Sequence, residues 1–190
     1  MKKIILFIIM CILSTPIVLA NNIHLNVDMP SKVNEGDNFT INVNVNPMAN
    51  NITGFECAMK PPFGKENYIK IINVKGNEKI KKEAGKFYSI DKKNSSVSIK
   101  FISFNKPLNS DFHLMTIKAV ALKSGNLSLT FEAVASDKNG EKIPVDEKTI
   151  NLLIINNSNN GNDIQSSSNR NFLSSLINAL TNFLKSILGG

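Results

Sequence analysis

Apolar and polar side chains alternate with a period of two through most of the chain between residues 23 and 155. In the clearest run, residues 39–46, four apolar side chains face one way and four polar side chains face the other. Because successive side chains of a strand point to opposite faces of its sheet, this period predicts half-buried strands of an antiparallel sheet. We expect further strands at residues 23–28, 53–60, 68–74, 86–90, 97–101, 113–122, 127–131 and 148–155.

Clusters of turn-forming residues separate these strands, for example Asn34-Glu35-Gly36-Asp37 and the hairpin turn expected at Asp137-Lys138-Asn139-Gly140. About nine short strands with no helical period between them predict an all-β fold, a nine-stranded antiparallel β-sandwich or jelly roll over residues 21–155. The lysine-rich run at residues 75–86 is expected to be a solvated loop or a short helix, with a docking patch as the alternative.

The first 20 residues are expected to be a signal peptide, because Lys2 and Lys3 precede a continuous apolar run and the small residue Ala20 precedes the expected cleavage site. The alternative is a membrane anchor, but the uninterrupted apolar run has about 10 residues and a spanning helix needs roughly 20. Loss of Lys2 and Lys3 lowers the formal net charge from +7 to +5. We therefore expect a secreted protein that is extracellular or associated with the cell surface.

Cysteine use and charge exclude several functions. Cys57 is the one cysteine left after cleavage, so an internal disulfide is impossible, and its alternation with Phe55 and Met59 predicts a core position. No nucleophile motif, metal cluster or phosphate loop occurs, so we expect no enzyme activity, no cofactor and no metal. The lysines are dispersed among acidic residues and Arg170 is the single arginine, which disfavours nucleic acid as a partner.

Five Asn-x-Ser/Thr triplets make N-glycosylation a hypothesis for an exported chain. The acceptor residues are Asn38, Asn51, Asn94, Asn126 and Asn156.

The C-terminal part has a different composition. Residues 156–171 are rich in Asn and Ser without periodicity and are expected to be a flexible linker, and residues 172–190 show the period of an amphipathic helix. An interfacial membrane helix is favoured, and docking onto the sandwich or self-association are the alternatives. The candidate membrane-facing residues are Leu173, Leu176, Leu180, Phe183 and Ile187.

Four stretches of the alternating region together carry a family resemblance: residues 34–45, 51–60, 114–129 and 135–145. Each stretch combines strand alternation with turn residues, as in Asn51-Ile52-Thr53-Gly54-Phe55, where a glycine precedes an apolar alternation. In order and content they resemble the cohesin domain, which docks dockerin modules in cellulose-degrading complexes and also occurs in surface proteins. The resemblance covers about residues 23–155.

The resemblance implies a nine-stranded jelly-roll sandwich related to carbohydrate-binding modules, without catalysis of its own. It also implies that one sheet face, made by the third, fifth, sixth and eighth strands, receives a dockerin-type protein partner. By alternation, the outward residues of that face are Glu56, Ala58, Lys60, Ser98, Lys100, Thr130 and Glu132.

The alternative function is a carbohydrate-binding or structural cell-surface module of the same fold, with an extracellular polysaccharide as the partner. A flat polysaccharide site needs exposed planar rings for stacking. The chain has no Trp, its two tyrosines are Tyr68 and Tyr88, and most of its 11 Phe are expected to point inward. This aromatic supply disfavours the carbohydrate alternative.

Overall fold

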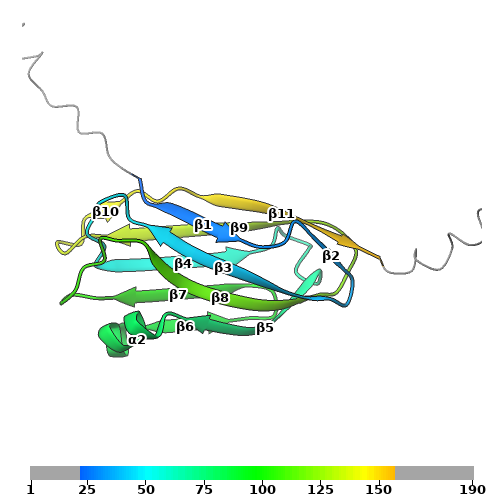
Figure 1. Cartoon of the computed structure of the whole chain (residues 1–190), viewed down its shortest axis with the longest axis horizontal. Helices are drawn as coiled ribbons and strands as arrows, with labels where there is room; N and C mark the ends of the chain where they lie inside the picture. Colours follow the sequence, from blue (N-terminus) through cyan, green and yellow to red (C-terminus); the bar gives the residue numbers. More distant parts are fainter. Residues whose placement is uncertain (1–21, 157–190) are drawn as a thin grey trace, which may run out of the picture.

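The computed structural model describes residues 22–156, which form a two-layer β-sandwich (Figure 1). One layer is a four-stranded antiparallel sheet with the strand order β1–β3–β8–β5. Its strands are β1 (His24–Asp28), β3 (Asn38–Asn46), β8 (Phe112–Ala121) and β5 (Ile69–Gly76).

The second layer is a seven-stranded sheet with the order β2–β11–β9–β4–β7–β6, to which β10 is added by pairing with β9. The pair β2 and β11 is parallel, and the other pairs are antiparallel. Its strands are β2 (Lys32–Asn34), β11 (Lys148–Ile155), β9 (Gly125–Ser136), β4 (Gly54–Lys60), β7 (Val97–Ile102), β6 (Ser89–Lys92) and β10 (Lys142–Ile143).

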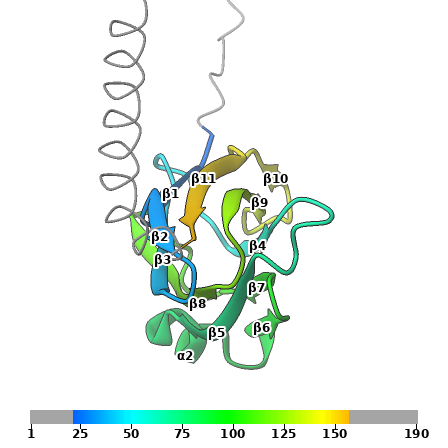
Figure 2. The same cartoon turned by 90° about the vertical axis from the view of Figure 1, so that its right-hand side faces the viewer.

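The core lies between the two sheets, which enclose it when the molecule is seen along its long axis (Figure 2). The expected alternation is confirmed on β3, where all four apolar side chains are buried and the polar ones are not. Rings from both layers meet in the core: Phe101 of β7 stacks on Phe55 of β4 with centroids 5.9 Å apart, and Phe112 of β8 meets both edge-on. The single hydrophobic core therefore joins the layers without a disulfide.

Cys57 lies in this core with no exposed surface, as its alternation predicts. Burial favours the neutral thiol and raises the pKa of Cys57 to about 12. A thiol of that pKa is protonated and unreactive at neutral pH.

The expected strand at residues 86–90 is wrong for its first three residues. The chain forms helix α2 (Glu78–Ala84) and the 3₁₀ turn η1 (Gly85–Phe87), and β6 begins at Ser89. Asn77 caps α2, because its Oδ1 accepts the N–H groups of Lys79 at 3.0 Å and Ile80 at 3.2 Å. The expectation of a short helix within residues 75–86 is thereby confirmed.

Two strands, β2 and β10, are absent from the expected set, because runs of three and two residues are too short to show a period. The hairpin turn between β9 and β10 is confirmed: Asp137 Oδ1 accepts the N–H groups of Asn139 at 2.8 Å and Glu141 at 2.9 Å. This turn closes one end of the seven-stranded sheet.

The expected signal peptide, nearly all of the expected linker and the expected amphipathic helix lie outside the described residues, as do Leu173, Leu176, Leu180, Phe183 and Ile187. Among residues 22–156, no helix is long and apolar enough to cross a membrane.

Candidate interaction face

The structure brings the seven expected partner-facing residues together on the outer side of the seven-stranded sheet, which we call the outer face. They come from β4, β7 and β9, which are neighbours, with β6 beside β7. Glu56 of β4 lies opposite Lys100 of β7, Ala58 lies between Ser98 and Glu132, and Lys60 lies opposite Thr130. The four strands named by the resemblance thus lie side by side.

One ion pair joins β4 and β9 on the outer face, near the end at which β4 finishes. Lys60 Nζ lies 2.8 Å from the carboxylate of Glu132, and both side chains are about half exposed. Next to it the hydroxyl groups of Thr130 and Thr149 lie 3.3 Å apart, which links β9 to β11. This polar strip can exchange its contacts for those of a partner at low cost, because exposed ion pairs contribute at most about 1 kcal/mol.

At the end of the outer face where β4 begins and β7 ends, the surface is hollowed. This hollow has a volume of about 540 Å³ and is lined by residues of β4, β6, β7, β9, β10 and η1. Gly54 occupies an outward position opposite Ile102 of β7 and Ser136 of β9, so the floor carries no side chain there. A Cβ at Gly54 would lie 2.5 Å from Ser136 Oγ, so a larger residue there would require the Ser136 hydroxyl to rotate away.

The rim of the hollow is apolar. Val134 of β9 and Ile102 of β7 line it together with Phe87 of η1, and Phe104 packs edge-on against Phe87 with centroids 6.0 Å apart. These four are among the nine large hydrophobic side chains exposed in residues 22–156, and Phe104 is 62% exposed. Nearly half of the exposed large apolar residues of the described part therefore gather at one place, which makes it a candidate interaction site.

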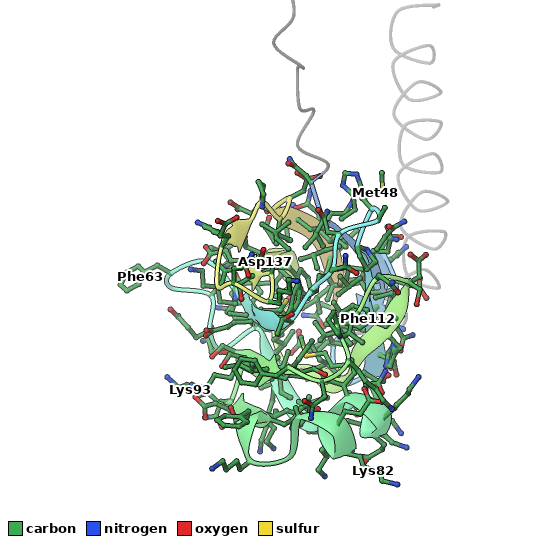
Figure 3. The ribbon with its side chains drawn as sticks, turned by 90° about the vertical axis from the view of Figure 1, so that its left-hand side faces the viewer. Met48, Phe63, Lys82, Lys93, Phe112 and Asp137 are labelled. Atoms are coloured by element: carbon green, nitrogen blue, oxygen red, sulfur yellow. The ribbon has the colours of Figure 1, made fainter. Side chains whose placement is uncertain are left out.

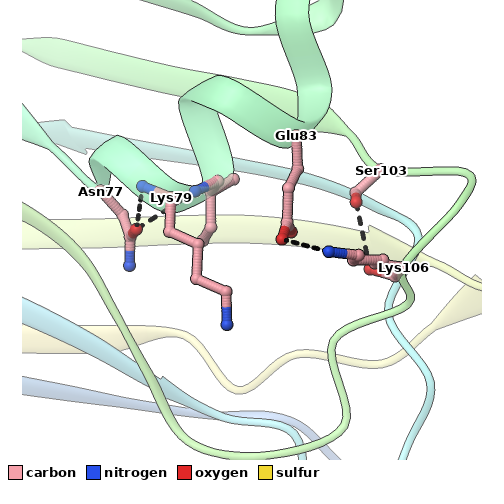
Figure 4. Close-up of polar contacts among 6 residues, drawn as sticks. Asn77, Lys79, Glu83, Ser103 and Lys106 are labelled. Carbon is pink, nitrogen blue, oxygen red and sulfur yellow. Dashed lines mark hydrogen bonds and ion pairs between the residues drawn. The ribbon is translucent and has the colours of Figure 1, made fainter.

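Polar contacts lie between α2 and the loop after β7, and within that loop (Figure 4). Lys106 Nζ lies 3.3 Å from Glu83 Oε1, which ties the loop after β7 to α2. Within that loop Ser103 Oγ donates to the carbonyl of Lys106 at 3.0 Å. The two contacts fix the loop that carries Phe104 against the helix that precedes Phe87.

The opposite end of the outer face carries a single aromatic residue. Phe63, on the loop after β4, is fully exposed and points away from the body of the domain (Figure 3). It lines a second hollow, of about 530 Å³, together with Lys60 and Glu132. The polar strip therefore has an apolar feature at each end.

Sequence reasoning found the middle of this face and, of the residues that line the hollow, Glu56 and Lys100. The expected strands ended at residues 101 and 131, whereas β7 extends to Ile102 and β9 to Ser136. The same alternation, continued by one step, would have added Ile102 and Val134 to the outward set. Phe87 and Phe104 lie on non-strand segments and gave no periodic signal.

The five candidate glycosylation residues, Asn38, Asn51, Asn94, Asn126 and Asn156, are all exposed, and their modification stays a prediction.

Tyr68 and Tyr88 are half-buried: the hydroxyl of Tyr88 abuts Gly76, and the ring of Tyr68 lies against Gly125. Within residues 22–156, no group of three His, Cys, Asp or Glu side chains could hold a metal ion.

Comparisons with solved structures identify the fold. The chain is similar to the cohesin module of a family 33 glycoside hydrolase from Clostridium perfringens, with a TM-score of 0.58 and 11% identity over 71% of this chain and 98% of that one. It is also similar to the cohesin CaCohA2 from Clostridium acetobutylicum, with a TM-score of 0.59 and 15% identity over 72% and 92% of the two chains.

A third similar structure is a non-cellulosomal cohesin from the archaeon Archaeoglobus fulgidus, with a TM-score of 0.53 and 13% identity over 73% and 96% of the two chains. No family model and no curated protein matches the sequence. Residues 22–156 therefore have the cohesin fold, at a sequence identity low enough that the likeness establishes the fold alone.

Proposed function

We propose that this chain is a secreted, noncatalytic recognition module that binds a dockerin-type protein partner through the outer face. One observation carries the proposal: in a cohesin fold, the outer face of the β6–β7–β4–β9 strands combines a polar strip with clustered exposed apolar side chains. Protein interfaces combine polar and exposed apolar groups, and on this face the apolar groups lie at the ends of the polar strip. The cohesin CaCohA2 has been solved in complex with CaDoc0917, which supports a protein as partner.

A protein partner is favoured over a polysaccharide. Tyr68 and Tyr88 are half-buried against glycines, and the ring of Tyr68 is also approached by two lysine ammonium groups at 5.4 and 5.3 Å. Neither ring offers the free flat surface that sugar stacking requires. Phe63 is exposed but stands alone at its end of the face.

Export and surface association belong to the same proposal and rest on residues 1–20 and 172–190 of the sequence. In this proposal the leader directs secretion and the amphipathic tail holds the module at a membrane surface. Co-sedimentation with lipid vesicles tests the second point: the mature chain should sediment and a chain ending at Asn156 should not. Equal partition of both would remove the membrane role of the tail.

Capture of partners from the host's secreted fraction tests the recognition role. The immobilised mature chain is compared with Ala58→Arg, which places a long charged side chain in the middle of the outer face. The matched control is Asn26→Arg, an exposed position on the outer side of the other sheet. We expect a partner with a dockerin-like calcium repeat to bind the wild type and the control and to lose at least about tenfold in affinity for Ala58→Arg.

Equal binding by all three proteins, or loss by the control alone, would contradict the proposed face. Capture of glycans with no protein would favour the carbohydrate alternative.

A further inference from the structure

The outer side of the four-stranded sheet carries lysines without carboxylates over three of its strands. The sequences of β3, β5 and β8 contain no Asp or Glu, whereas Lys70 and Lys75 of β5 and Lys118 of β8 are all exposed. We call these three residues the lysine face. Within residues 22–156 none of them forms an ion pair. The hollow on the other sheet differs, because the carboxylate of Glu56 lies among its lysines, which are Lys86, Lys100 and Lys142.

A β-bulge places the three lysines on the same side of the sheet. Lys70 and Lys75 are five positions apart, so strict alternation would point them to opposite sides. The register between β5 and β8 shifts at Ile72, and this extra residue reverses the alternation, so that Lys75 points outward like Lys70. Lys118 lies between their two levels on β8, so a lysine stands at each of three successive outward levels, about 7 Å apart along the strands.

The acidic residues of the adjoining elements α2 and β1 do not compensate this charge. Helix α2 follows β5 directly, but Glu78 Oε2 lies 3.9 Å from Lys81 Nζ and Glu83 Oε1 lies 3.3 Å from Lys106 Nζ. Asp28 lies on β1, which β3 and β8 separate from β5. An anionic ligand on the lysine face therefore gains attraction that no neighbouring carboxylate already supplies.

The groups around the lysines indicate which kind of anion fits. By register Lys118 lies between Asn73 and Thr40, both exposed, whose amide and hydroxyl groups can bond to the hydroxyl groups of a sugar. A membrane surface is disfavoured, because interfacial binding buries an apolar face and Ile72 is the one large apolar residue exposed on the four described strands of this sheet. Nucleic acid is disfavoured, because these strands carry no arginine and their aromatic rings belong to the core.

We propose that the lysine face binds an acidic polysaccharide, a polymer of sugar residues that carry carboxylate groups. Its carboxylates face Lys70, Lys75 and Lys118, and its hydroxyl groups bond to Asn73 and Thr40. Charge pairing combined with hydrogen bonding needs no stacked ring, so the scarcity of exposed aromatic residues does not weigh against this ligand. The inference goes beyond the proposed function, because it assigns a second ligand to the opposite sheet. A module with both surfaces joins a protein partner to an extracellular polymer.

Two polymers test it. Oligogalacturonate, a short polyuronate, and neutral dextran of the same length are titrated separately into the mature chain by isothermal titration calorimetry, and nuclear magnetic resonance shifts locate the site. We expect the polyuronate to bind at least about tenfold more tightly than the dextran and to shift Lys70, Lys75 and Lys118. Its affinity should fall as salt is added, because exposed charges are screened.

Two double variants with the same change of net charge separate this site from the overall charge of the protein. Lys70→Glu with Lys118→Glu should weaken the polyuronate at least about tenfold. The matched control is Lys138→Glu with Lys148→Glu, which changes exposed lysines of the β9–β10 turn and of β11 and should retain the wild-type affinity. Thermal unfolding of each variant verifies that it is folded.

Three results would overturn the inference: equal affinity for the two polymers, equal losses in the two double variants, or shifts confined to residues outside the lysine face. Anionic phospholipid vesicles that bind the wild type but not Lys70→Glu with Lys118→Glu, without any binding of the polyuronate, would also overturn it and would assign the face to a membrane. Capture of the protein partner, tested with Ala58→Arg, uses the other sheet, so the two proposals can fail independently.

Discussion

The outer sides of the two sheets follow the same alternation but differ in how their side chains are engaged. On the four-stranded sheet the polar groups bind one another: Thr116 Oγ1 donates to Asn42 Oδ1 at 3.0 Å and lies 3.0 Å from His113 Nε2, while His113 Nδ1 lies 3.0 Å from Asn44 Oδ1. On the seven-stranded sheet the apolar rim of the hollow is exposed and its lysines form no ion pairs among the described residues.

The polar cluster of Asn42, His113 and Thr116 has its partners in place, whereas the apolar rim of the hollow gains free energy by being covered. A polar network with its partners in place has little to gain from a ligand, because each new hydrogen bond replaces an existing one. Exposed apolar groups and uncompensated charges gain from a complementary partner. Alternation identifies which residues face outward, but the tertiary contacts decide whether they are available.

The largest effect is expected at the core that both sheets share. Phe101 is 1% exposed and contacts Phe55 and Phe112, so Phe101→Ala should lower the free energy of unfolding by about 3–5 kcal/mol. Val134→Ala at the rim of the hollow should cost below about 1 kcal/mol, because Val134 is 48% exposed. Urea denaturation measures both, and equal losses would contradict the division between core and outer face.

Alkaline pH should weaken the shared core through Cys57. In the unfolded chain the thiol ionises near its ordinary pKa of 9.0, while burial keeps it protonated in the folded chain to about pH 12. The folded state then holds a proton that the unfolded state releases, so stability falls by about 1.4 kcal/mol per pH unit across that window and is unaffected below it. Cys57→Ala should lack this slope. Chemical denaturation of both proteins at a series of pH values measures it, because the lysine titrations affect both proteins equally and cancel in the difference between their free energies of unfolding.

The polar network of the four-stranded sheet should contribute measurably to stability. Thr116→Val removes the hydroxyl between Asn42 and His113 and should cost about 0.5–1.5 kcal/mol in chemical denaturation. Thr149→Val on the other sheet removes a 3.3 Å contact between exposed hydroxyls and should cost less. A larger loss for Thr149→Val than for Thr116→Val would contradict the stabilising role of the polar network on the four-stranded sheet.

The smallest effect is expected from the Lys60–Glu132 pair on the outer face. A double-mutant cycle with Lys60→Ala and Glu132→Ala should give a coupling energy of about 0.5 kcal/mol or less, reduced further at about 0.5 M salt. A coupling well above about 1 kcal/mol would show that this pair stabilises the fold and is not readily exchanged for partner contacts.

Strand identity was predictable where the period extended over many residues. The buried positions of β3 and the outward positions Glu56, Ala58 and Lys60 of β4 follow from alternation alone, because side-chain direction in a strand is a local geometric property. The strand expected at residues 86–90 failed in its first half, because the chain forms the 3₁₀ turn η1 there, directly after α2, whose Ile80 and Ala84 are buried in the core. Such burial depends on what the neighbouring strands leave open, which local sequence does not record.

The sequence by itself determined a two-layer β fold, the core position of Cys57 and the seven outward residues, because the two-residue period fixes which side of a strand each side chain takes. Only the tertiary structure decided that Ile102, Val134, Phe87 and Phe104 gather around a glycine floor with three lysines at the edge. These residues come from two strands, a 3₁₀ turn and a loop that are distant in the chain. Their proximity arises from sheet pairing and from the contact between α2 and the loop after β7, which are long-range interactions without a local pattern.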